Sequence, residues 1–161
     1  MRRIVLFIAL LTLAHACAGC ASGPGEERSE PGSSSRSSVS EQQGVSVTLR
    51  VKPASTGAGG SFSLTLDVRN VSGEPRAFTL PSSQAFEFIA FVAKGPEVWR
   101  WSEGMAFAQA IQQETLEPGE NRVFKAAWPT DGASPGQYLI QGYFTGLPDA
   151  VPGVEVEITG L

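Results

Sequence analysis

Alternation of apolar residues with polar or small residues is the feature that most constrains how this chain can fold. Rows with this period of two lie at 45–51, 62–68, 123–128, 138–144 and 154–158. Successive side chains of a β-strand point to opposite faces, so each row predicts a strand with one buried face. The run 85–93 is apolar on both faces and predicts a central strand.

Segments rich in Gly, Pro, Asn and Asp separate these rows, among them "NVSGEP", "EPGEN" and "TDGASPGQ". Such residues provide the backbone conformations and local hydrogen bonds that tight turns require. We expect the Asn70 side chain to bond local backbone in its turn. The segment 106–112 permits a short piece of helix or a strand, and no long segment has a helical period. Short strands at this spacing predict an all-β fold, an antiparallel sandwich or barrel.

The first 19 residues predict an export signal that is not part of the fold. Two arginines after the first Met precede an apolar run at 4–16. This run is too short to span a membrane comfortably and has the length of the apolar region of a secretory signal.

Small residues Ala18 and Gly19 then precede Cys20, which resembles the lipobox of bacterial lipoproteins. The resemblance implies cleavage before Cys20, lipidation of this residue and anchoring to a membrane. Lipoboxes usually have Leu where this chain has Cys17, and Cys17 is the alternative lipidation site. We therefore expect an exported protein anchored in the cell envelope. No Asp follows Cys20, which favours the outer membrane if the host has two membranes.

Ser, Gly, Pro and Glu dominate the residues that follow Cys20, as far as residue 44. A stretch of this composition buries too little apolar surface to offset the entropy cost of ordering it. The sequence therefore predicts a disordered tether at 20–44 and one globular domain at 45–161.

The residue types in this domain exclude several kinds of chemistry. Cys17 and Cys20 are the only cysteines, and the only histidine, His15, lies in the predicted signal. The domain therefore has no Cys nucleophile, no Ser-His-Asp triad and no His-ligated metal. We predict that it is not an enzyme and has no catalytic residue, metal or cofactor.

The charge balance bears on partners. Without the two arginines of the signal the chain has 16 acidic and 10 basic residues, and the basic ones are not clustered. This predicts no nucleic-acid binding, since that requires a basic patch. We expect a monomer.

An ordered series of motifs runs from residue 63 to residue 146. Its most distinctive members are "LPSSQAFEF", "VWRWS", "LEPGE" and "PGQY". The series resembles the bacterial intracellular proteinase inhibitor family of the BsuPI type. This resemblance implies an immunoglobulin-like β-sandwich that inhibits a subtilisin-like serine proteinase. The namesake is intracellular whereas this chain has an export signal, so the resemblance bears on the fold more directly than on the partner.

Four residues of the "VWRWSEGMAF" stretch are the candidate partner-binding residues: Trp99, Trp101, Met105 and Phe107. On a strand Trp99 and Trp101 share a face, and Met105 and Phe107 repeat that parity. The pattern favours a core row, because each Trp buries on the order of 200 Å². An exposed patch is the alternative, since Trp and Met are favoured at protein interfaces. One buried Trp and one at the rim would be an intermediate outcome.

Two functions fit these observations. In the first, an envelope-anchored inhibitor presents an extended loop to the cleft of a serine proteinase, by strand addition in one version. The candidate loops are 102–109, 130–135 and 147–153. In the second, an immunoglobulin-like adhesion or scaffold module binds an envelope protein without inhibiting a proteinase.

Overall fold

A computed structural model describes residues 34–160. The predicted signal peptide, Cys17, Cys20 and the first part of the predicted tether lie outside the described residues. Between residues 34 and 160 the regular structure is entirely β. This part of the chain contains no helix that is long and apolar enough to cross a membrane.

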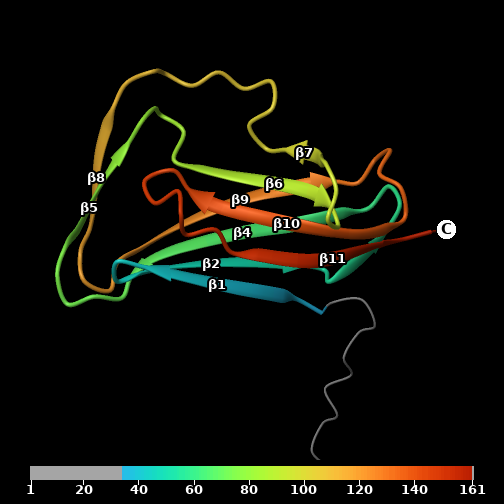
Figure 1. Cartoon of the computed structure of the whole chain (residues 1–161), viewed down its shortest axis with the longest axis horizontal. Coiled ribbons are helices and arrows are strands. Elements are labelled where there is room, and N and C mark those ends of the chain that lie inside the picture. Colours follow the sequence, from blue (N-terminus) through green and yellow to red (C-terminus); the bar gives the residue numbers. More distant parts are fainter. Residues whose placement is uncertain (1–33, 161) are drawn as a thin grey trace, which may run out of the picture.

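Two sheets stack face to face as a sandwich (Figure 1). The first sheet consists, in spatial order, of β1 (Arg36–Gln42), β2 (Val45–Lys52), β4 (Ser61–Asn70) and β9 (Asn121–Pro129). The second consists of β3 (Ser55–Gly57), β11 (Gly153–Thr159), β10 (Gly136–Phe144), β6 (Phe86–Val92) and β7 (Glu97–Arg100). Only the β3–β11 pair is parallel among the described strands. The all-β, immunoglobulin-like sandwich is thus confirmed.

The alternating rows of the sequence become the inner faces of the two sheets. In β2 and β4 the register pairs Val47 with Val68 and Leu49 with Leu66, and these four side chains are fully buried. Opposite them lies Ile140 of β10, which is also buried. Burial of one such side chain contributes about 1.5–3 kcal/mol, so these rows supply the main driving force for folding.

The apolar run at 85–93 forms β6, which lies between β10 and β7. The prediction of a central strand is confirmed, because both of its faces are covered. Phe88 and Ala90 face the sandwich core, while Glu87 and Ile89 on the other face are also buried.

Strand β1 corrects the predicted tether, because residues 36–42 are paired with β2 along its length. Residues 36–42 of the predicted tether are therefore ordered as a strand, contrary to the prediction that the tether is disordered as far as residue 44. The reason is that β1 is held by backbone pairing to the edge of β2 and not by an apolar row. Its one apolar residue, Val39, is 60% exposed.

A third, two-stranded sheet consists of β5 (Arg76–Leu80) and β8 (Gln112–Leu116) at one end of the sandwich (Figure 1). Asn70, at the end of β4, connects the turn between β4 and β5 to this third sheet. Its buried side-chain amide donates to the carbonyl oxygens of Glu74 (2.7 Å) and Leu116 (2.8 Å). The side-chain carbonyl oxygen of Asn70 accepts the backbone N–H of Ser72 at 2.9 Å. The predicted turn role of Asn70 is confirmed.

Candidate functional site

The tryptophans of the "VWRWS" motif lie where the two sheets meet along one side of the sandwich. β7 is the last strand of its sheet and β9 is the last strand of the other. Trp99 of β7 stacks on Trp128 of β9, with ring centroids 6.0 Å apart. Three half-buried aromatic side chains form a second ring group that packs against the same core: Phe86, Trp101 and Phe124. We call these five residues the aromatic edge.

Close ring contacts hold the second group of the aromatic edge together. Phe86 lies between Trp101, at 4.1 Å between ring centroids, and Phe124, at 4.7 Å. Phe107 contacts Trp101 from outside, at 6.0 Å. An aromatic pair contributes about 0.5–1.5 kcal/mol beyond the burial of its area. These ring contacts make Phe86, Trp101 and Phe124 part of the sandwich wall.

The four predicted partner-binding residues divide between two environments. Trp99, Trp101 and Phe107 are half-buried, and the two tryptophans pack against the core. Met105 stands outside this group, with 48% of its surface exposed. Both tryptophans are thus half-buried and pack against the core, so neither the fully buried row nor the exposed patch describes them.

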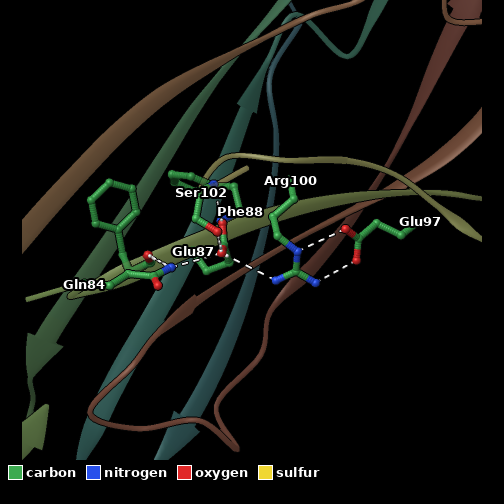
Figure 2. Close-up of polar contacts among 7 residues, drawn as sticks. Gln84, Glu87, Phe88, Glu97, Arg100 and Ser102 are labelled. Atoms are coloured by element: carbon green, nitrogen blue, oxygen red, sulfur yellow. Dashed lines mark hydrogen bonds and ion pairs between the residues drawn. The ribbon is translucent and has the colours of Figure 1, made fainter. Parts of the chain in front are cut away.

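Glu87 is a site residue that the sequence analysis missed. Its carboxylate is 2% exposed and accepts the backbone N–H groups of Phe88 (3.1 Å) and Ser102 (3.2 Å). It also accepts a short hydrogen bond from the Ser102 hydroxyl and one from the Gln84 amide at 3.0 Å. Figure 2 shows these groups converging on one carboxylate, together with Arg100. The only sequence signal was one carboxylate inside an apolar run, "AFEFIAFVA".

Arg100 connects this buried carboxylate to the surface (Figure 2). Its guanidinium lies 3.4 Å from Glu87 and donates two hydrogen bonds to Glu97, the shorter at 2.7 Å. The hydrogen bond from Arg100 lowers the pKa of Glu97, and the bond to Glu97 raises the pKa of Arg100. Both groups therefore stay charged near neutral pH. We call Glu87 and the residues bonded to its carboxylate the Glu87 cluster: Gln84, Phe88, Arg100 and Ser102. A buried carboxylate destabilises a fold unless it is paired and hydrogen-bonded, and Glu87 meets that condition.

The cluster determines how the chain leaves β7. Ser102, held by Glu87, begins a turn in which the N–H of Met105 donates to the carbonyl oxygen of Ser102 at 3.0 Å. Gly104 in this turn has a φ of 75°, which favours glycine. The segment 105–111 then runs across the top of the view in Figure 1 toward β8 and belongs to no strand. It is neither the short helix nor the strand that the sequence allowed.

A second attachment lies in the middle of this segment. The N–H of Ser83 donates to the carbonyl oxygen of Ala108 at 3.0 Å, and the N–H of Ala108 donates to the Ser83 hydroxyl at 2.9 Å. Of residues 105–111 only Phe107 is half-buried, and the others are exposed. The segment is therefore an exposed chain that follows a turn held by Glu87 and is bonded at Ala108 to Ser83 of the loop between β5 and β6.

The two other candidate loops are built differently. In 147–153, Leu147 and Ala150 are buried, so this loop is part of the core wall. In 130–135, Thr130 is fully buried and its hydroxyl donates to the carbonyl oxygens of Gly57 and Gly60. The loop 130–135 also lines, with Trp99 and Trp128, a pocket of about 320 Å³. Of the three loops, 102–109 leads into the longest exposed run.

The described residues contain no group of three or more Cys, His, Asp or Glu side chains that could hold a metal ion. Ser102 does contact a carboxylate, which resembles the first step of nucleophile activation. However, the Glu87 carboxylate is shared among five hydrogen bonds that fix the turn. The arrangement is suited to holding a surface segment rigidly, and rigidity is what a protein-binding surface requires.

Comparisons with known proteins bear on this arrangement. The sequence model of one family, described as BsuPI, intracellular proteinase inhibitor, matches residues 41–148, more than half of the 161-residue chain. No curated protein sequence matches the chain.

Among the solved structures to which this chain shows similarity are three much longer proteins. A Paenibacillus sp. cycloisomaltooligosaccharide glucanotransferase is 13% identical with a TM-score of 0.45, over 69% of this chain and 13% of that one. A Listeria innocua beta-glucosidase is 14% identical with a TM-score of 0.42, over 80% and 16%. A Pseudomonas fluorescens alkylpurine DNA glycosylase is 12% identical with a TM-score of 0.43, over 76% and 30%. This chain thus spans less than a third of each.

Proposed function

Because this chain belongs to the BsuPI family of intracellular proteinase inhibitors, we propose that its sandwich binds and inhibits a subtilisin-like serine proteinase. The family match carries the proposal, since it covers β2 through β10 and includes the aromatic edge, the Glu87 cluster and the segment 105–111. The structure supports it in one further respect. An exposed segment fixed to a rigid sandwich is the form of surface that an enclosing cleft accepts at low entropy cost.

We further propose that the inhibitor works outside the cytoplasm, attached to a membrane of the envelope through lipid on Cys20. The support is the Ala-Gly-Cys series at the end of the predicted signal. A domain held there meets secreted or envelope proteinases, so the partner differs in location from that of an intracellular inhibitor. Metabolic labelling with palmitate tests this: Cys20→Ala should abolish labelling and Cys17→Ala should not. The reverse result would assign the lipid to Cys17. No labelling of the unsubstituted protein would refute the anchor.

Inhibition is tested with the exported protein, purified from membranes in detergent and titrated against secreted serine proteinases. We expect stoichiometric inhibition of at least one subtilisin-like enzyme. If none is inhibited, the adhesion or scaffold alternative gains support. A pull-down from envelope extract with Trp99→Ala as the matched variant then identifies a partner that depends on the aromatic edge.

A further inference from the structure

We propose that the segment 105–111 enters the proteinase cleft and that Met105 fills the primary specificity pocket, so that the partner is a proteinase with an apolar pocket. This inference rests on the proposed function and names its contact residue and its class of partner. We call 105–111 the contact segment.

The composition of the contact segment excludes one class of proteinase. It reads Met-Ala-Phe-Ala-Gln-Ala-Ile and has no charged residue, and no Lys or Arg occurs between Arg100 and Arg122. Trypsin-like enzymes have an acidic pocket that requires Lys or Arg, whereas chymotrypsin-like pockets are hydrophobic slots. An uncharged segment therefore complements an apolar pocket.

Its two attachment points select Met105 within the segment. On one side the N–H of Met105 donates to the carbonyl oxygen of Ser102, in the turn that Glu87 holds. On the other side both backbone groups of Ala108 are bonded to Ser83, in the loop between β5 and β6. Only Ala106 and Phe107 lie between Met105 and Ala108. Phe107 turns inward onto Trp101 and Ala106 is small, so Met105 presents the one large exposed side chain of this part.

Ile111 is more exposed than Met105, at 73% against 48%, but it lies beyond both attachment points, next to β8. Its β-branched side chain also has few rotamers, whereas Met is unbranched and adapts to irregular pockets. A side chain that enters a pocket must be both accessible and held at its backbone. Met105 meets both conditions and Ile111 meets only the first.

A specificity exchange tests the inference with the exported, membrane-purified protein. We expect Met105→Arg to lose about 100-fold or more in inhibition of an apolar-pocket proteinase such as subtilisin and to gain inhibition of trypsin, since a pocket rejects a mismatched charge strongly. The matched control is Val123→Arg. Val123 lies on β9 outside the contact segment and is 47% exposed, almost the same fraction as Met105. The inhibition by this control should stay within about twofold of the original value, because substitutions at exposed sites outside a contact surface usually have small effects.

The outcomes separate this inference from the proposed function. If the unsubstituted protein inhibits subtilisin and the two variants behave alike, Met105 is not the contact residue and the proposed function survives. If the unsubstituted protein inhibits no serine proteinase, both proposals fail. Cleavage of the Met105→Arg variant by trypsin after position 105, without inhibition of trypsin, would also overturn the inference. The segment would then be a substrate and not an inhibitor loop. Equal unfolding temperatures of the two variants exclude misfolding as the cause of a difference.

Discussion

Replacement of Glu87 by Ala should destabilise the whole domain, although the residue is a carboxylate inside an apolar strand. The change removes the acceptor of both Ser102 groups, the Gln84 amide and Arg100. A buried donor left without a partner costs about 1–3 kcal/mol. Ser102 and Arg100 are only half-buried, so water recovers part of this cost. Removal of a buried carboxylate also relieves its own desolvation.

We therefore expect Glu87→Ala to lower the free energy of unfolding by about 2–3 kcal/mol, or about 10 °C in Tm for a domain of this size. Urea denaturation followed by far-UV circular dichroism measures the change. Glu103→Ala is the matched control, because Glu103 is an exposed carboxylate in the same turn. A surface change of this kind should stay within about 0.5 kcal/mol.

The comparison of these two variants tests the reasoning directly. If Glu87→Ala and Glu103→Ala unfold at the same urea concentration, the Glu87 cluster does not stabilise the turn. Glu87→Gln adds a second measurement, since the amide keeps one acceptor oxygen but presents a donor where Glu87 accepts. We expect it to lie between the wild type and Glu87→Ala, and a Glu87→Gln protein less stable than Glu87→Ala would contradict the hydrogen-bond account.

Three further variants probe other parts of the molecule. Asn70→Ala removes two hydrogen bonds from a fully buried amide to backbone carbonyls. It should lower the free energy of unfolding, measured by urea denaturation, by about 2–3 kcal/mol. A decrease below about 0.5 kcal/mol would show that the turn forms without this side chain. Phe107→Ala uncovers one face of Trp101 and should shift Trp fluorescence to longer wavelength, whereas an unchanged spectrum would mean that Phe107 does not cover that ring. Arg100→Ala should raise the pKa of Glu97 toward its ordinary value in an NMR titration. The pKa of Glu97 is lowered by folding, so the small stability from this pair is present above the unfolded pKa and is lost as pH falls through the folded one.

The strands with an alternating row could be predicted because one sheet face is buried and the other is not. β1 could not be predicted in this way, since it is held by backbone pairing to β2 and its Val39 is exposed. Backbone pairing leaves almost no mark in composition. The boundary of an ordered domain is therefore predicted too far inward wherever an edge strand is polar.

The four predicted partner-binding positions show a second limit of prediction from the sequence. Parity placed Trp99 and Trp101 on one face, and both do turn toward the core. The same parity failed for Met105, because the turn that contains Gly104 interrupts the strand and resets the direction of the side chains. Glu87 was missed for a related reason: its partners at 100–102 become neighbours only when β6 and β7 pair. A buried carboxylate is understood only once its donors are known.

The same geometry favours loop insertion over strand addition for the proposed mode of binding. The free side of β7 is short, four residues, and two of them are the charged pair Glu97 and Arg100. Charged residues and short length are the devices by which edge strands avoid pairing with other chains. β9 is longer but has Lys125 among its outward residues and ends at Pro129. The contact segment has no charged residue and no proline, a residue that also protects edge strands. Under the proposed binding through this segment the edges at β7 and β9 stay unpaired, and Lys125→Val should increase self-association in light scattering without changing inhibition. A loss of inhibition in that variant would indicate that the β9 edge, and not the contact segment, meets the proteinase.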